Sequence, residues 1–174
     1  DGAHVEFFRG IANPVGVNVG PNLTGEEAVA LCRTLNPRNE PGKLTLIHRM
    51  GADRVAASLP PLVEAVTRAG CRVLWVCDPM HGNTTPTASG RKTRSFSAIL
   101  RELEQAFELH ARMGTVLGGV HLELTGDHVT ECVGGAWGLS EADLEQAYET
   151  DVDPRLNYQQ SVELALRIAH KMGG

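Results

Sequence analysis

The sequence has few aromatic residues, no long apolar run and no large excess of charge. Of its 174 residues, 5% are aromatic, 42% hydrophobic and 21% charged, with a net charge of −5. This composition is typical of a globular domain and argues against a disordered, collagen-like or disulfide-dense chain. No apolar stretch approaches the ~20 residues of a membrane span, and no basic-then-apolar signal segment opens the sequence. We therefore expect a cytoplasmic protein with no membrane partner.

Several further motifs are also absent. No basic stripe is visible, which argues against nucleic acid as a partner, because such surfaces bind through counterion release. The cysteines form no C-x-x-C pair, so we expect reduced thiols. Neither G-x-G-x-x-G nor G-x-x-x-x-G-K-[ST] occurs, so a nucleotide site lacks its phosphate loop. A serine hydrolase likewise lacks its G-x-S-x-G elbow.

Short β-branched runs alternate with helical patterns four times along the chain. The predicted strands cover residues 15–19, 44–47, 72–77 and 119–124. Five helices are predicted. The first begins at Thr24, with Glu27 completing a capping box, and the second runs from near Pro60 to Gly70. A strongly amphipathic helix covers Phe96 to Met113, a short one is capped by Ser140, and the last begins near Asn157. A loop of about 17 residues separates the third strand from its helix.

Repeated β-then-α units predict parallel strands, because a parallel neighbour needs a crossover helix. A small doubly wound sheet and part of an eight-stranded barrel both fit. The polar residues gather just after each strand, where a barrel carries its chemistry, but a whole barrel usually needs ~250 residues. The α/β pattern therefore indicates half of a (β/α)8 TIM barrel with about four βα units. Since the first residue is Asp1 rather than Met, we expect a piece of a longer protein.

Three residues at the ends of successive units form a candidate metal site. His81 lies in the turn after the third predicted strand, Glu123 on the fourth strand, and Asp153 in an acidic turn at 150–157. One imidazole and two carboxylates suit Mn²⁺, Fe²⁺, Co²⁺ or Zn²⁺. The separations of 42 and 30 residues match no short ligand spacing. Turn-forming carboxylates and a hydrogen-bonded loop histidine therefore remain the alternative.

Basic residues form a second group near the same strand ends: Arg49, Lys92, Arg94 and Arg155. Arginine binds phosphate bidentately and lysine binds it as a point charge, so this group is suited to a small phosphorylated anion. Solvated surface charges are the alternative. His110 lies on the apolar face of a predicted helix and is expected to be a packed residue rather than a ligand.

Specific motifs occur in a fixed order along the chain. They are D-G-A-H at 1–4, R-G-I-A-N-P at 9–14, L-N-P-R-N-E-P-G at 35–42, L-T-L-I at 44–47 with R-M-G at 49–51, D-P-M-H-G-N-T at 78–84, K-T-R at 92–94, G-G-V-H-L-E at 118–123, T-E-C at 130–132, and D-P-R-L-N at 153–157 with Q-S at 160–161. Through these motifs the sequence closely resembles the type II 3-deoxy-D-arabino-heptulosonate 7-phosphate (DAHP) synthases of plants and actinobacteria.

This resemblance implies the C-terminal half of a single catalytic (β/α)8 barrel domain over residues 1–174. The implied enzyme is a metal-dependent transferase that condenses phosphoenolpyruvate with erythrose 4-phosphate, the entry step of the shikimate route, and forms a homo-oligomer at full length. Its metal ligands match His81, Glu123 and Asp153, with Mn²⁺ or Co²⁺ as the usual ion. A phosphoenolpyruvate-binding arginine matches Arg49, and a lysine near the phosphate site matches Lys92.

The sequence departs from the family pattern at Asn18, where the family has a lysine that contacts phosphoenolpyruvate. Asparagine keeps the hydrogen bonding at this substrate-binding position and loses the charge. In addition, the family's cysteine ligand and other phosphoenolpyruvate-binding arginines belong to a part upstream of Asp1. Two alternatives therefore stay open: an enzyme of the same fold acting on an amino sugar phosphate, and a non-catalytic half-barrel that binds a partner or metabolite.

Overall fold

The computed structural model describes residues 2–172 and shows helices and strands alternating along the chain. The α-helices are α1 (Ala3–Arg9), α2 (Gly25–Leu35), α3 (Val55–Arg68), α4 (Phe96–Arg112) and α5 (Tyr158–Met172). The strands are β1 (Val15–Val19), β2 (Leu44–His48), β3 (Leu74–Cys77), β4 (Thr84–Pro86), β5 (Lys92–Arg94) and β6 (Leu117–Val120). Two short 3₁₀ helices are η1 (His81–Asn83) and η2 (Glu141–Glu145). Asp1, Gly173 and Gly174, which the predicted domain 1–174 includes, lie outside the described residues.

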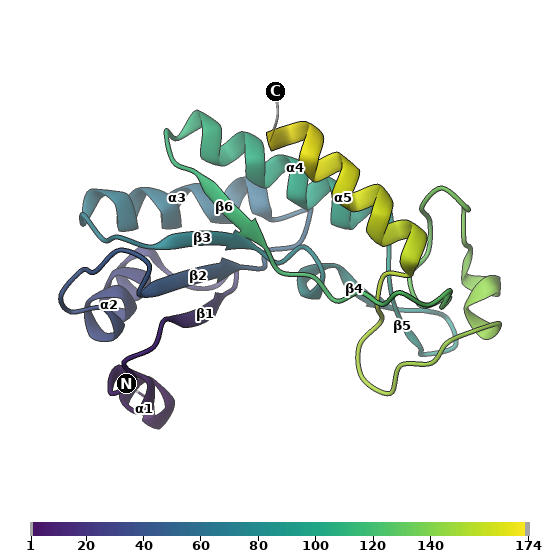
Figure 1. The fold of residues 1–174 in the computed structure, drawn as a ribbon, viewed down its shortest axis with the longest axis horizontal. Helices are drawn as coiled ribbons and strands as arrows, with labels where there is room; N and C mark the ends of the chain where they lie inside the picture. Colours follow the sequence, from purple (N-terminus) through teal and green to yellow (C-terminus); the bar gives the residue numbers. More distant parts are fainter. Residues whose placement is uncertain (1, 173–174) are drawn as a thin grey trace.

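Four strands form one parallel sheet in the order β1-β2-β3-β6, with β2 and β3 in its centre (Figure 1). The predicted parallel sheet and its alternating βα units are thus confirmed. The predicted strand at residues 15–19 has the observed bounds, whereas the fourth strand ends at Val120 rather than at residue 124. Such an arrangement is compatible with part of a barrel.

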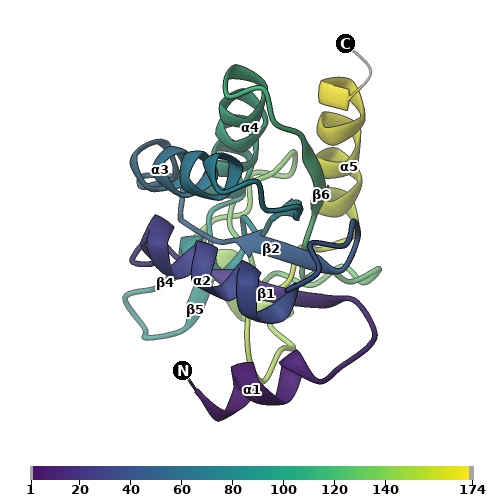
Figure 2. The same ribbon diagram turned by 90° about the vertical axis from the view of Figure 1, so that its left-hand side faces the viewer.

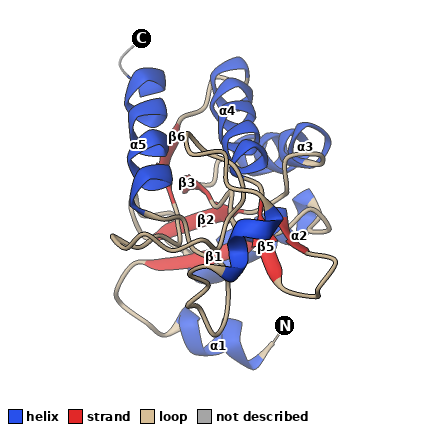
Figure 3. Ribbon diagram, turned by 90° about the vertical axis from the view of Figure 1, so that its right-hand side faces the viewer, coloured by secondary structure: helices blue, strands red, loops and turns tan. Residues whose placement is uncertain are grey.

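Helices cover one side of this sheet. Figures 2 and 3 show α2, α3 and α4 on that side and α5 beyond β6, next to α4. Along β2 the side chains of Leu44, Leu46 and His48 are buried, and those of Thr45 and Ile47 are only partly covered. On β1, Asn18 lies in register with Ile47 and is exposed. One face of the sheet therefore packs against helices while the other is open.

The hydrogen-bond ladder continues one residue past three of the strands. Arg49 N donates to Val19 O at 3.0 Å, Asp78 N to His48 O at 2.8 Å, and His121 N to Cys77 O at 2.8 Å. Further along, Leu124 and Leu156 form a parallel bridge. These bonds align the carboxyl ends of the strands, so the loops that follow them begin side by side.

The helix predicted to begin near Pro60 corresponds to α3 and begins earlier than predicted. Helix α3 starts at Val55, five residues before Pro60, and contains both Pro60 and Pro61. The N–H groups that these prolines lack would reach the carbonyls of residues 56 and 57. Both of those residues are exposed, so water can satisfy the carbonyls. The expectation that proline marks the first helical turn was wrong here.

Other local predictions are confirmed. Thr24 and Glu27 form the predicted capping box at the start of α2, and Ser140 caps η2 through Asp143. Helix α4 ends at Arg112, followed by Gly114 at φ +67°. The predicted loop between β3 and α4 contains the antiparallel hairpin β4–β5, which the sequence pattern does not indicate. No helix within residues 2–172 has both the length and the apolar character needed to cross a membrane.

Two histidines are buried in the layer between the sheet and α4. His48 and His110 are 0% and 1% exposed, and their rings stack with centroids 5.7 Å apart. His110 is therefore a packed residue, as predicted. Burial lowers the pKa of His48 to about 3 and that of His110 to about 4, with His110 adding to the effect on His48. Both imidazoles are neutral in the folded state at neutral pH.

We expect this pair to make the fold sensitive to mild acid. Since both folded pKa values lie below the ordinary value of 6.5, the unfolded chain binds protons more readily. Stability is therefore retained above pH 6.5 and lost as the pH falls from there toward 4. The substitution His110→Asn keeps an amide donor near Thr115 and removes one titrating group. The free energy of unfolding of the intact protein, measured by urea unfolding at several pH values, should fall less steeply with falling pH in this variant. The difference in this pH dependence should reach up to about 1.4 kcal/mol per pH unit. An unchanged slope would contradict the prediction.

Candidate functional site

Side chains from three separate loops converge at the carboxyl ends of the strands. His81 is the first residue of η1, which follows β3; Glu123 follows β6, and Asp153 lies in the loop before α5. One ligand atom from each lies within 4.8 Å of the other two, and all three residues are partly buried. Imidazole nitrogen and carboxylate oxygen are donors that divalent first-row metals accept. The three residues that the sequence analysis grouped therefore do come together.

The imidazole of His81 is held by the carboxylate of Asp78. Nδ1 of His81 lies 2.6 Å from Oδ2 of Asp78, which is 1% exposed. The other oxygen of Asp78 accepts the backbone N–H groups of Met80 and His81 at 3.0 and 3.1 Å. Because a carboxylate only accepts, Nδ1 donates this hydrogen bond, and Nε2 is the ring nitrogen left to bind a metal. Nε2 lies 3.3 Å from Oε1 of Glu123, so it faces the cluster.

Glu123 is fixed by a buried arginine. Nη1 of Arg94 pairs with Oε2 of Glu123, and Nε of Arg94 donates to the hydroxyl of Thr84 at 2.8 Å. Arg94 is 0% exposed. Arg94 is one of the four cations that the sequence predicts to bind an anion. In the structure its guanidinium holds a carboxylate of the cluster from behind.

Asp153 is paired with Lys92. Nζ of Lys92 lies 2.8 Å from Oδ1 of Asp153, and this hydrogen bond is the main cause that lowers the pKa of Asp153. The charges of Lys92, Arg94 and His81 act in the same direction, against partial burial. Asp153 is therefore ionised at neutral pH. Lys92 keeps 54% of its side chain exposed, so it remains accessible to solvent.

The loop that carries Asp153 is anchored by Glu131, which is fully buried. Arg155 makes a two-point contact with Glu131, at 2.6 Å through Nη2 and 3.0 Å through Nε. The backbone N–H groups of Arg155 and Thr150 donate to the same carboxylate at 2.7 and 3.0 Å. Arg155 thus stabilises the loop through Glu131, and its guanidinium is already occupied.

Arg49 and Asn18 lie on neighbouring strands. Asn18 pairs in register with Ile47 of β2, and Arg49 lies two residues after Ile47, so alternation directs all three toward the open face. Arg49 is partly buried, and within residues 2–172 its guanidinium makes no hydrogen bond or ion pair. Among these four cations, Lys92, Arg94 and Arg155 each form an ion pair, whereas the side chain of Arg49 forms none within residues 2–172.

Sequence reasoning missed two buried carboxylates. Glu131 lies within the T-E-C motif at 130–132, which by itself indicates no role for the glutamate. Glu102 sits on the buried face of α4, between Ile99 and Ala106. The available signal was an acidic residue at the helical spacing of an apolar face, where a charge needs partners.

Comparison with known proteins agrees with the family resemblance of the sequence motifs over nearly the whole chain. The model of the class-II DAHP synthetase family matches residues 1–169. The phospho-2-dehydro-3-deoxyheptonate aldolase AroG of Mycolicibacterium smegmatis is 52% identical over 172 residues, which is 99% of this chain and 37% of that protein. The aldolase of the same name from Streptomyces coelicolor is 53% identical over 169 residues, 97% of this chain and 38% of that protein.

A fungal relative is similar to the same extent. The phospho-2-dehydro-3-deoxyheptonate aldolase of Neurospora crassa is 53% identical over 171 residues, covering 97% of this chain and 36% of that protein. The chain thus spans less than two fifths of the length of the curated relatives it matches. With a family match from residue 1 to residue 169, the chain belongs to the class-II DAHP synthetase family.

Proposed function

We propose that this chain forms the C-terminal half of the catalytic barrel of a DAHP synthase. Such an enzyme condenses phosphoenolpyruvate with erythrose 4-phosphate, releasing DAHP and phosphate. The observation that carries the proposal is the convergence of His81, Glu123 and Asp153 at the strand ends of a chain from this family. The open face of the four-stranded sheet supports the barrel, because that face would line a barrel interior. A cytoplasmic homo-oligomer is the expected setting.

The donor set fits a divalent metal. His81 offers Nε2, oriented by Asp78, and Glu123 and Asp153 each offer a carboxylate oxygen. The carboxylate–histidine arrangement is the usual support for a metal-binding imidazole. Mixed nitrogen and oxygen donors suit Mn²⁺ or Co²⁺ better than a soft ion. When bound, such an ion would supply Lewis-acid polarisation of the aldehyde oxygen of erythrose 4-phosphate.

The chain's own cations would bind and orient the two anionic substrates. The free guanidinium of Arg49 suits the carboxylate or phosphate of phosphoenolpyruvate, which it can contact bidentately. Lys92, half-exposed beside Asp153, suits a substrate phosphate. In the proposed reaction C3 of phosphoenolpyruvate attacks the aldehyde carbon, water adds at C2, and phosphate leaves with cleavage of the C–O bond. These residues offset charge while the two substrates are aligned.

Asn18 favours a second candidate, an enzyme of the same fold that uses an amino sugar phosphate. Asn18 is exposed on the open face of β1, in the register row next to Ile47. A neutral amide there carries less charge toward an anionic substrate than the lysine that the family resemblance implies. Comparing erythrose 4-phosphate with its imino analogue as acceptors, at saturating phosphoenolpyruvate, separates the two candidates.

The first test of the proposed function is His81→Ala in the intact protein. Removing the imidazole donor should abolish tight Mn²⁺ binding and metal-dependent formation of DAHP, because this chain then contributes only two carboxylates to the site and an incomplete ligand set holds the ion weakly. His121→Ala is the matched control, since His121 is exposed and lies outside the cluster. Metal content and a phosphate-release assay give the two readouts. Normal metal content and turnover in His81→Ala would refute the ligand assignment. An inactive wild-type protein would favour the non-catalytic alternative.

A second prediction concerns Asn18→Lys. Adding a cation on the open face should lower KM for phosphoenolpyruvate by about tenfold, the effect of one new charge-assisted contact. Steady-state kinetics with the intact enzyme measures this, and Asn18→Gln, which lengthens the side chain without a charge, is the control. A lysine variant with unchanged or higher KM would mean that Asn18 does not face phosphoenolpyruvate.

A third prediction tests the proposed barrel half. Within residues 2–172, strands β1 and β6 each have one unpaired edge in the four-stranded sheet, and one sheet face is uncovered. The isolated 174-residue chain should therefore aggregate or self-associate rather than remain a monomer of 18.7 kDa. Light scattering after size exclusion, combined with thermal unfolding, checks this. A monodisperse monomer that melts cooperatively would refute the barrel half.

A further inference from the structure

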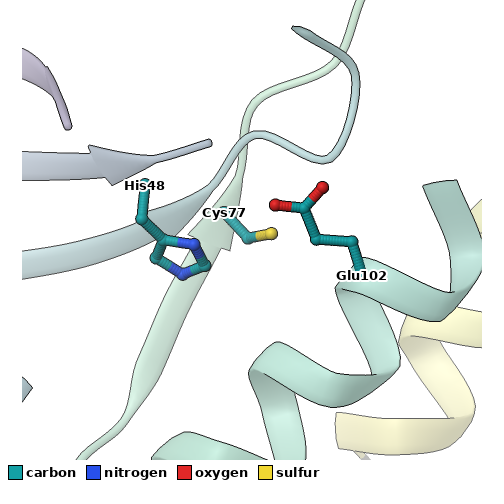
Figure 4. A group of neighbouring side chains, drawn as sticks. All are labelled: His48, Cys77 and Glu102. Carbon is teal, nitrogen blue, oxygen red and sulfur yellow. The ribbon is translucent and has the colours of Figure 1, made fainter. Parts of the chain in front are cut away.

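Glu102 is a fully buried carboxylate that the proposed reaction does not use. It projects from α4 toward Cys77 at the end of β3, as Figure 4 shows. Within residues 2–172 it forms no ion pair with any lysine, arginine or histidine. Burying an uncompensated charge is costly, so a site that needed only packing would be better served by an apolar residue. The carboxylate therefore needs an explanation in what it binds.

Its two oxygens bind two different loops. Oε1 accepts the backbone N–H groups of Met50 and Gly51 at 2.8 and 2.9 Å. Oε2 accepts Nδ2 of Asn83 at 2.7 Å. Oδ1 of Asn83 in turn accepts Ala52 N at 3.0 Å, which returns the network to the first loop. Three N–H donors to one carboxylate are strong, charge-assisted bonds in a buried setting.

The two loops are those of the proposed site. Met50 and Gly51 directly follow Arg49, the arginine with free donors. Asn83 is two residues after His81, in the same 3₁₀ turn. One side chain on a helix thus connects the loop that presents the substrate-binding arginine with the loop that presents the metal-binding imidazole.

The loops also touch through their backbones at two glycines. A Cβ on Gly82 would lie 2.4 Å from Gly51 N, and a Cβ on Gly51 would lie 2.7 Å from Gly82 O. Gly51 has φ +84°, a conformation that L side chains rarely adopt. This close approach needs an element that holds both backbones in place, and Glu102 bonds to Gly51 N itself.

We propose that Glu102 is a positioning residue that sets the placement of the Arg49 loop relative to the His81 loop. This role rests on the proposed function, since it concerns the distance between substrate-binding and metal-binding groups. Glu102 touches neither substrate nor metal and acts only through Met50, Gly51 and Asn83. An apolar residue in its place would leave two backbone N–H groups without a partner, at a cost in local order as well as stability.

A different role for the same carboxylate would be a second metal site. His48, Cys77 and Glu102 each offer one ligand atom within 4.8 Å of the others, and all three are buried. His48 has no hydrogen-bond partner at either ring nitrogen within the described residues. Because Glu102 already accepts three donors that hold the loops, the observations favour the positioning role. Elemental analysis for a thiolate-binding ion such as Zn²⁺ distinguishes the two.

The experiment uses Glu102→Gln in the intact protein. The glutamine oxygen can still accept Met50 N and Gly51 N, but its NH₂ group then faces the NH₂ group of Asn83. The link to the His81 loop should therefore fail first. We expect the Kd for Mn²⁺, measured by equilibrium dialysis without substrate, to rise by about tenfold or more. KM for phosphoenolpyruvate should change by less than about threefold, because the Arg49 loop keeps its bonds.

Leu103→Ala is the matched control, since Leu103 is a buried neighbour on α4 outside the network. It should lower the melting temperature while leaving Mn²⁺ affinity near that of the wild type. If Glu102→Gln does not fold, Asn83→Ser removes the same link from the other side and should give the same loss of affinity. Equal Mn²⁺ affinity in wild type and the folded variant would overturn the positioning role. So would one equivalent of zinc in the wild type that both Glu102→Gln and Cys77→Ser lose.

The controls also separate this role from the proposed function. A wild-type protein that neither binds Mn²⁺ nor forms DAHP would refute the proposed function and the positioning role with it. The positioning role alone would be refuted by an active wild type in which Glu102→Gln and Leu103→Ala raise the Kd for Mn²⁺ equally for the same drop in melting temperature.

Discussion

The candidate site depends on buried carboxylates that accept backbone N–H groups. Asp78 holds the turn before His81, Glu131 holds the loop around Asp153, and Glu102 connects the Arg49 and His81 loops. Each carboxylate is nearly or fully buried, and each accepts at least two backbone N–H groups of irregular segments. The strand ladder extends only one residue into the loops, so it offers these N–H groups no acceptor. These acids supply the missing acceptors, so irregular segments acquire fixed positions.

The parallel sheet provides the common edge from which these loops start. Hydrogen bonds that run one residue past β2, β3 and β6 tie Arg49, Asp78 and His121 to the last residues of the neighbouring strands β1, β2 and β3. The Leu124–Leu156 bridge then brings the Asp153 loop up to Glu123. Since the helices occupy one face only, the polar side chains at this edge border the open face. Backbone pairing therefore accounts for the convergence of residues that are far apart in the sequence.

The four strands of the parallel sheet, the amphipathic α4, the Thr24 capping box and the Ser140 N-cap followed from local periodicity and turn chemistry, which the structure confirms to within a few residues. The start of α3 did not, because a helix tolerates Pro60 and Pro61 when solvent can satisfy the carbonyls they leave. The grouping of His81, Glu123 and Asp153 was predictable from strand ends together with family resemblance. The roles of Arg94 and Arg155 were not, since only three-dimensional contacts show that Glu123 and Glu131 occupy them. Glu102 and Glu131 were missed because most of their partners are backbone N–H groups, which leave no mark in the sequence, and the side chains they bind, Asn83 and Arg155, lie 19 and 24 positions away.

The contact between Gly51 and Gly82 has a consequence for how this chain tolerates mutation. Any side chain at either position collides with the backbone of the other loop, so a single close contact restricts both positions to glycine. Replacing one glycine cannot be compensated by changing the other, because glycine is already the smallest residue. A deep mutational scan would therefore find that neither position tolerates substitution, although the two lie 31 positions apart. The tips of exposed turns such as the one at Gly90, where a Cβ meets nothing within 4 Å, are free of this restriction.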